Sequence, residues 1–282
     1  MPVKIISDST CDLSEDLLQK YEIALSPLTV TLGGRSGHDG VDITPDDIYV
    51  YVERTGELSQ TSAVSVGEYE EIFGHWRGLG FEIVHFCISA KLSVSYQNAC
   101  LAAEEVGGVT VIDSANLSTG QGLVVLNAAE MAMAGASAEQ IVRASEDLIP
   151  RVEASFVADS IEYLRKGGRC SALSAWGANL FHIKPCIEVA DGGMHPGKKY
   201  HGKLSHVIRA YAEDRLKNRQ DIDTRRIFIT HTRCDEETVE QVRGLIREYC
   251  PDVTEILETT AGATITTHCG PGTLGVLFIR KS

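Results

Sequence analysis

His268 has the sequence surroundings best suited to chemistry in this chain of 282 residues. It stands two residues before Gly270-Pro271-Gly272, a combination typical of a tight turn ahead of a strand. A histidine held by such a turn is often a structural hydrogen-bonding group. Beside a cleft, the same side chain can bind a carboxylate or act as a base. Both interpretations stand at this point.

Two hydroxyl-rich segments, 60–65 and 89–97, could face His268 and contain Thr61 and Ser93. Each segment also has the composition of a loop that caps a helix. A serine paired with a histidine suggests acyl transfer, so an acyl-ester or thioester hydrolase that uses Ser93 and His268 is one hypothesis. No aspartate or glutamate can be identified from the sequence as the third member of a triad. The alternative is a binding protein with no catalytic residue.

Polar residues also follow three strand-like segments, at 7–10, 89 and 113–114. A helix follows each of these segments, so the side chains can be ordinary helix caps. They can also line a site for a polar or anionic head group near helix N-termini.

The sequence contains none of the common nucleotide-binding motifs. There is no G-x-G-x-x-G after the first strand and no G-x-x-x-x-G-K-[ST]. Its eight cysteines include no C-x-x-C pair and no spacing typical of zinc ligands. We therefore expect neither a cofactor nor a metal.

The pattern of elements predicts an α/β protein with two domains. In residues 1–155, strands at 3–6, 81–88 and 109–112 alternate with helices, which indicates a parallel sheet in an α/β/α layer arrangement. In residues 156–282, the pattern favours a two-layer α/β domain with a mixed or antiparallel sheet.

The charge distribution supports the same division. The chain has a net charge of −13; residues 1–155 carry 8 basic and 23 acidic side chains, and residues 156–282 carry 18 and 16. This acidity disfavours nucleic-acid binding. No apolar run is long enough to cross a membrane, so at most a transient membrane-surface contact is expected. The N-terminus reads as a strand and lacks the features of a secretory signal, which favours the cytoplasm.

Seven segments, in order along the chain, together resemble the motifs of the DegV family. Residues 6–13 are similar to its opening strand and loop, and residues 61–69 to its TSxPSxGEF segment. The other matching segments are 88–99 (ISSxLSGTYQSA), 111–114 (VIDS), 163–169 (YLKKGGR), 183–185 (IKP) and 267–275 (THTGPGALG). The resemblance covers nearly the whole chain.

The resemblance implies a protein that binds one long-chain fatty acid, with the acyl tail buried and the carboxylate at the domain junction. Some members are binding subunits of bacterial fatty acid kinase and present the carboxylate to a separate kinase subunit. By position, Thr61, Ser93 and His268 match the residues that contact the head group. Arg169 matches an arginine thought to act near the exposed head group. A fatty acid carrier, with a kinase subunit as a possible partner, is therefore the leading hypothesis.

Alanine-rich helices suggest where the tail lies. Ala99, Ala102 and Ala103 fall in one predicted helix of the N-terminal domain, and residues 123–134 form another. Small side chains could leave room for an acyl chain, and each buried methylene contributes about 0.8 kcal/mol. We therefore expect the N-terminal domain, residues 1–155, to hold the tail, and residues 156–282 to close over the head group.

Overall fold

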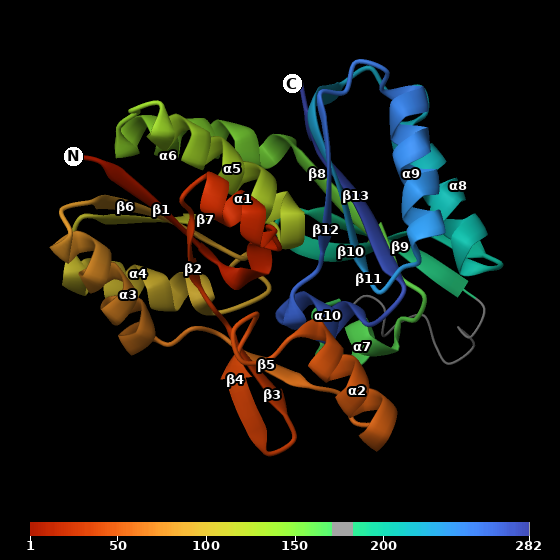
Figure 1. The fold of residues 1–282 in the computed structure, drawn as a ribbon, viewed down its shortest axis with the longest axis horizontal. Helices are drawn as coiled ribbons and strands as arrows, with labels where there is room; N and C mark the ends of the chain where they lie inside the picture. The colour runs from red at the N-terminus through yellow and green to blue at the C-terminus, as the bar shows by residue number, and fades with distance from the viewer. Residues whose placement is uncertain (171–182, 282) are drawn as a thin grey trace.

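The computed structural model describes residues 1–170 and 183–281, which form three sheets (Figure 1). The first sheet is parallel, in the order β2-β1-β6-β7, and confirms the predicted fold class of the N-terminal half. Its strands are β1 (Val3–Asp8), β2 (Ala24–Ser26), β6 (Glu82–Cys87) and β7 (Val109–Asp113).

Helices cover both faces of this sheet. One face packs against α3 (Val66–Gly78) and α4 (Ser95–Val106), and the other against α1 (Glu15–Lys20), α5 (Ser118–Met133) and α6 (Ala138–Leu148). The short 3-10 helix η1 (Ser9–Cys11) follows β1, and η2 (Ile149–Arg151) follows α6.

Local sequence signals explain where several helices begin. Ser65 and Ser137 form capping boxes at the starts of α3 and α6, each with the residue three positions later. Thr44 forms the same motif with Asp47 at the start of α2 (Pro45–Thr55). These reciprocal bonds satisfy backbone N–H groups that have no partner within the helix.

The second sheet has six strands in the order β10-β9-β8-β13-β11-β12. Only β11 and β12 run parallel, so the predicted mixed sheet is confirmed. Helices α8 (Leu204–Leu216) and α9 (Glu236–Tyr249) cover one face. The strands are β8 (Val152–Val157), β9 (Ile183–Ala190), β10 (Gly193–His201), β11 (Ile222–Thr232), β12 (Glu255–Thr260) and β13 (Thr273–Arg280). The predicted division between residues 155 and 156 falls inside β8.

Helix α5 lies between the two large sheets (Figure 1). Its buried residues share one apolar cluster with Ile5 and Phe86 of the first sheet and with Phe228 and Leu277 of the second. Most of its length is buried, so its apolar residues are not confined to one face. The small residues of this helix therefore serve close packing against two sheets.

A third, small antiparallel sheet has the order β4-β3-β5 and lies beside α2. Its strands are β3 (Thr29–Leu32), β4 (Arg35–His38) and β5 (Gln60–Ser62). Gly33 adopts a positive φ of 60°, which glycine tolerates, in the tight turn that leads from β3 into β4.

Two short helices from the second half of the chain lie next to this small sheet: α7 (Glu162–Gly167) and α10 (Ala263–Cys269). Ala263 belongs to the same apolar cluster as Val30 and Ile48. The two halves also meet at Glu130 of α5, which pairs with Arg225 and Arg226. The C-terminal half thus contacts the N-terminal half, which surrounds the N-terminal end of α10.

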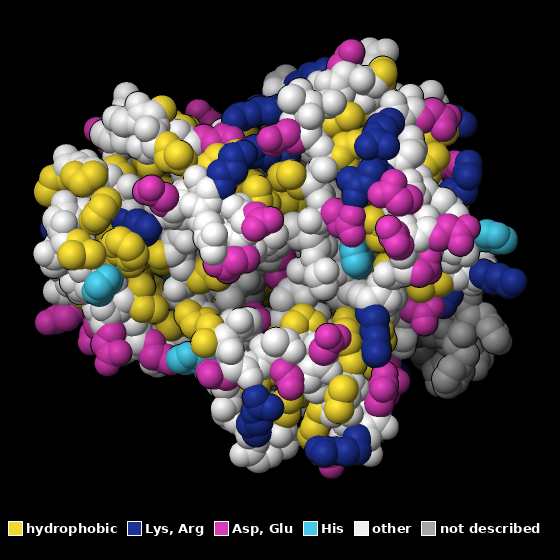
Figure 2. All heavy atoms as spheres, in the orientation of Figure 1, with side chains coloured by type: hydrophobic (Ala, Val, Ile, Leu, Met, Phe, Trp, Pro, Cys, Tyr) yellow, Lys and Arg dark blue, Asp and Glu magenta, His cyan; other side chains and the backbone are white. Residues whose placement is uncertain are grey.

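The surface in Figure 2 differs between the two halves. Acidic and basic side chains alternate over α9, where Arg243 pairs with Glu240 and Glu258. Hydrophobic side chains gather over the N-terminal lobe. In residues 1–170 and 183–281, no helix combines the length and the apolar character needed to cross a membrane.

Candidate functional site

The four residues singled out in the sequence line one cavity at the junction of the halves. Thr61 comes from β5, Ser93 from the loop before α4, and His268 from the last turn of α10; Arg169 follows α7. The remaining wall is largely apolar and includes Leu28, Ile88, Leu92, Leu117, Met194 and Ile265. A head-group site with an apolar extension is therefore assembled from both halves.

The imidazole of His268 is joined directly to Thr61. Its Nε2 lies 2.8 Å from Thr61 Oγ1. Burial, with a smaller contribution from the positive charge of Arg169, lowers the pKa of His268 to about 4. The ring is therefore neutral at pH 7. It can donate one hydrogen bond to Thr61 and leave the threonine hydroxyl free to donate to a ligand oxygen.

Ser93 has a local role as well as a place in the cavity wall. Its Oγ lies 2.9 Å from Ser95 Oγ and accepts a 3.2 Å hydrogen bond from the backbone N–H of Ser95 at the start of α4. This bond stabilises the turn that leads into α4, whose own N-cap residue, Val94, offers no side-chain cap. Because the hydroxyl also borders the cavity, the two roles are compatible.

The geometry does not support a hydrolase that uses Ser93 and His268. His268 Nε2 is directed to Thr61, and within the described residues its Nδ1 has no hydrogen-bond partner. A catalytic histidine of this kind needs a carboxylate or similar group on one nitrogen and the nucleophile on the other. Neither contact is formed here.

Arg169 lies exposed at the edge of the cavity. Its Nη1 donates a 2.8 Å hydrogen bond to the carbonyl of Gly167. The guanidinium is therefore solvated, and its effect on a ligand at the head-group residues is that of a nearby surface charge.

Gly167 packs directly on the imidazole of His268. A Cβ at this position would lie far inside van der Waals contact with His268 Nδ1. Close approach of the α7 backbone thus helps to hold the ring against Thr61.

Gly167→Ala is therefore expected to push His268 away from Thr61 and toward solvent. The pKa of His268 should rise from about 4 toward its ordinary value of about 6.5, because the cost of burying the imidazolium falls. An NMR titration of the histidine ring measures this shift. Gly244→Ala in α9, where an added Cβ meets open space, is the matched control. A His268 pKa that stays near 4 in Gly167→Ala would contradict this view of the contact.

A second cavity lies next to the cavity of Thr61 and His268, and we call the apolar region that contains both the seam. The two cavities measure about 40 and 30 Å³ and share Leu117, Ile265 and Cys269 as lining residues. Both are far below the roughly 300–1,000 Å³ of a typical ligand pocket. A ligand with a long tail can enter only if the walls of this seam move apart. No sequence signal distinguished these apolar residues from ordinary core.

The polar residues at the strand ends are mostly used within the fold. Gln121 accepts a hydrogen bond from Thr10 and donates one to Ser7, and Ser89 donates to the carbonyl of Gly192. Asp113 accepts from the N–H of Ala115. None of these polar side chains lines the cavity of Thr61 and His268. The helix- and loop-stabilising interpretation accounts for them.

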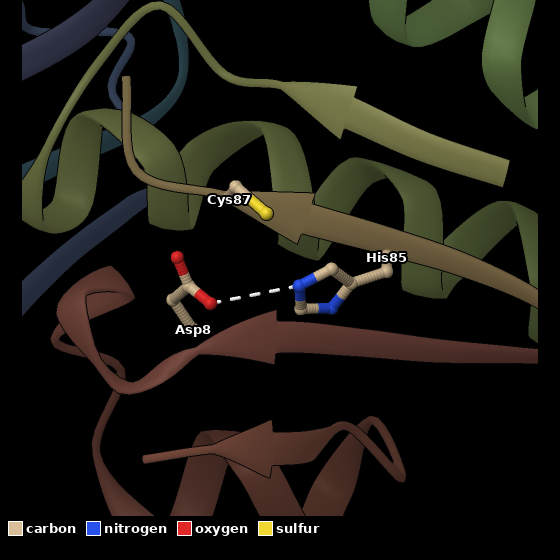
Figure 3. A group of neighbouring side chains, drawn as sticks. All are labelled: Asp8, His85 and Cys87. Atoms are coloured by element: carbon tan, nitrogen blue, oxygen red, sulfur yellow. Dashed lines mark ion pairs between the residues drawn. The ribbon is translucent and has the colours of Figure 1, made fainter. Parts of the chain in front are cut away.

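Asp8, His85 and Cys87 form a buried group with ligand-type atoms within 4.8 Å of one another (Figure 3). His85 Nε2 lies 3.5 Å from Asp8 Oδ1 without forming a hydrogen bond. Asp8 Oδ1 already accepts bonds from Ser26 and Tyr69, and Oδ2 accepts one from the N–H of Ile88. These contacts occupy the carboxylate that a metal would need, so the group fits a structural junction of β1, β2, α3 and β6 better than a metal site.

Comparison with known proteins matches the whole chain to one family. The family model described as "Uncharacterised protein, DegV family" covers residues 2–281. A DegV domain-containing protein of Caldanaerobacter subterraneus subsp. tengcongensis is 33% identical over 282 residues, 99% of each chain.

Two solved structures with similar folds are described as lipid-binding or fatty acid-binding proteins. A DegV lipid-binding protein from Thermotoga maritima has a TM-score of 0.87 and 29% identity, over 99% of each chain. A fatty acid-binding DegV family protein from Thermus thermophilus has a TM-score of 0.88 and 29% identity, over 99% of this chain and 100% of that one. The chain described here belongs to the DegV family.

Proposed function

We propose that this protein binds a long-chain fatty acid, with the carboxylate at Thr61, Ser93 and His268. The observation that carries the proposal is the 2.8 Å contact between Thr61 and His268, which joins the two halves at the mouth of an apolar seam. The lipid-binding relatives from Thermotoga maritima and Thermus thermophilus support it.

The chemistry of the head-group residues suits a carboxylate. Two hydroxyls and a neutral imidazole can supply hydrogen bonds without a buried cation that would itself need a partner. Arg169, exposed nearby, adds a favourable positive potential without being desolvated. Affinity then comes mainly from the tail, at about 0.8 kcal/mol for each buried methylene.

We place the tail in the seam marked by Leu117, Ile265 and Cys269. This is the apolar surface continuous with the head-group cavity, because the three residues line both cavities. The sequence-based alternative, a tail within the N-terminal domain, relied on residues 123–134 and on Ala99, Ala102 and Ala103. The first segment belongs to α5, which packs against both large sheets. The three alanines pack in the cluster that contains Tyr69 and Phe73.

The N-terminal half also has a larger groove, of about 800 Å³, lined by α1, α5 and the start of β1. It includes Val3 and Phe81, whereas the head-group residues lie near the other end of the sheet, beyond Cys87. The groove is therefore a poor continuation of the head-group site despite its size.

Lipid extraction tests the proposed function directly. Purified protein is denatured in organic solvent, and the extract is examined by mass spectrometry. We expect one long-chain fatty acid for each chain, and exchange for added palmitate in the native protein. A protein that yields no lipid and binds no palmitate would contradict the proposal.

We further propose that the protein is a carrier, which presents the carboxylate to a fatty acid kinase subunit in the cytoplasm. The support is family membership together with the exposed Arg169 beside the head-group cavity. The buried residues Cys11, Cys87 and Cys250 are free thiols, as expected for a reducing compartment. The protein itself supplies no catalytic residue in this scheme.

Arg169→Ala is expected to leave the dissociation constant for palmitate within tenfold of the wild-type value. An exposed cation near a carboxylate contributes about 0–1 kcal/mol. Transfer of phosphate to the bound acid by a kinase subunit should fall much further, because the exposed guanidinium borders the surface that the enzyme must approach. Titration calorimetry and an acyl phosphate assay separate the two effects. Loss of palmitate binding itself would instead make Arg169 a buried anchor.

A further inference from the structure

The N-terminus of α10, the helix that carries His268, is held by two carboxylates from the opposite end of the chain. Asp12 Oδ1 accepts a 2.8 Å hydrogen bond from the N–H of Gly262. Asp39 accepts from the N–H of Ala263 on Oδ1, at 2.7 Å, and from that of Thr264 on Oδ2, at 3.2 Å. The first N–H groups of a helix have no partner within it, so these three bonds fix where α10 begins.

Both carboxylates are themselves buried and held in place. Ser118 donates a 2.5 Å hydrogen bond to Asp12, and Ser9 donates a 2.9 Å bond to Asp39. Each aspartate is at most 5% exposed, and neither forms an ion pair with a described residue. Burial, with a smaller contribution from the nearby charge of Asp39, raises the pKa of Asp12 to about 8. Helix N–H groups and the helix dipole compensate such a charge.

The same small sheet positions both Asp39 and Thr61. Asp39 follows β4, which pairs with β3, and Val30 of β3 lies opposite Thr61 of β5. Asp39 therefore ties α10 to the unit that supplies Thr61. The 2.8 Å contact between Thr61 and His268 joins the same two units, the small sheet and α10.

We infer that Asp39, supported by Asp12, is a positioning residue for the head-group site: it seats α10 so that His268 meets Thr61. The inference extends the proposed fatty acid site to residues that do not line its cavity. It predicts that loss of the clamp, meaning the bonds from Asp12 and Asp39 to α10, affects recognition of the carboxylate more than recognition of the tail.

Asp39→Asn is the most direct test. Asparagine has one acceptor oxygen where aspartate has two, so its amide N–H groups would face a helix N–H that donates in the wild type. We expect palmitate affinity to fall at least tenfold, and hexadecanol affinity, which needs no carboxylate contacts, to stay within threefold. The matched control is Asp235→Asn, because Asp235 caps α9 by the same kind of bond and lines neither cavity. This control should change neither affinity.

The ring of His268 supplies a readout that does not depend on lipid. In Asp39→Asn, an NMR titration should show the His268 pKa moving upward as the ring leaves its buried position. If Asp39→Asn does not fold, Ser9→Ala, which removes one donor to Asp39, gives a milder test of the same bonds. Wild-type palmitate affinity and an unchanged His268 titration in these variants would overturn the inference.

The proposed function and the clamp fail in different ways. If wild-type protein binds palmitate and hexadecanol equally, and His268→Ala changes neither, the fatty acid head-group site is wrong. The NMR titration of Asp39→Asn still decides whether the clamp seats His268. An equal fall in the affinities for palmitate and hexadecanol in Asp39→Asn would assign Asp39 a general structural role and contradict the inference.

Discussion

His268→Ala is expected to weaken palmitate binding ten- to a hundredfold and to leave hexadecanol binding unchanged. Hydrogen bonds to a charged group contribute about 1.5–3 kcal/mol each, and about 1.4 kcal/mol corresponds to a factor of ten in the dissociation constant. Removing the imidazole also frees Thr61 from its 2.8 Å contact, so the remaining hydroxyl is less well oriented. Titration calorimetry with both lipids measures the effect.

Ser93→Ala should act on palmitate in the same direction. The double variant should lose less binding free energy than the sum of the two single variants, because both side chains contact one carboxylate. Binding should persist in each case, since the tail provides most of the affinity. If the His268 and Ser93 variants bound palmitate as the wild type does, the head-group assignment would be wrong.

Ile265→Trp is expected to reduce binding of palmitate and hexadecanol alike by a hundredfold or more. Ile265 lines both cavities of the seam and is 7% exposed. An indole there would occupy space for about three or four methylenes, which is worth about 3 kcal/mol at 0.8 kcal/mol each. A fall in affinity for both lipids indicates that the tail site is blocked, whereas damage to the head-group site lowers the affinity for palmitate alone.

Two variants in α4 make the tail experiment decisive. Leu101→Trp changes an exposed side chain and should bind both lipids normally. Ala102→Trp enlarges a buried residue of the N-terminal domain, so it would block the tail if the tail lay there. Ile265→Ala, which widens the seam, should retain binding and guards against a folding defect in the tryptophan variant. Wild-type binding of both lipids by a folded Ile265→Trp protein would contradict the placement of the tail in the seam.

Local patterns predicted elements where neighbouring residues determine them. The helix starts at Ser65 and Ser137 can be recognised in the sequence, because a capping box is complete within four residues. Helix α10 escaped prediction because its threonines and Ile265 have low helix propensity. Its start is stabilised instead by Asp12 and Asp39, more than 200 residues away in the sequence. Strand β10 escaped because Pro196 suits an edge strand and a bulge rather than a regular strand.

The candidate site shows the same limit. Thr61, Ser93 and His268 were selected by residue type and by the family resemblance, and the structure brings them to one cavity. Leu117 and Ile265 look like ordinary core residues in the sequence. They line both cavities only after α10 has packed beside the six-stranded sheet. Long-range packing of this kind leaves no local signal.

The chain order of β13 and α10 has a consequence for biosynthesis. Strand β13 lies between β8 and β11 in the six-stranded sheet, so β8 and the β11–β12 pair stay separate until residues 273–280 are present. His268 comes from α10, directly before that strand, and its partner Thr61 lies 207 residues earlier in the chain. Although N-terminal segments of a growing chain can fold first, neither the complete six-stranded sheet nor the Thr61–His268 contact can form before β13 and α10 have been synthesised.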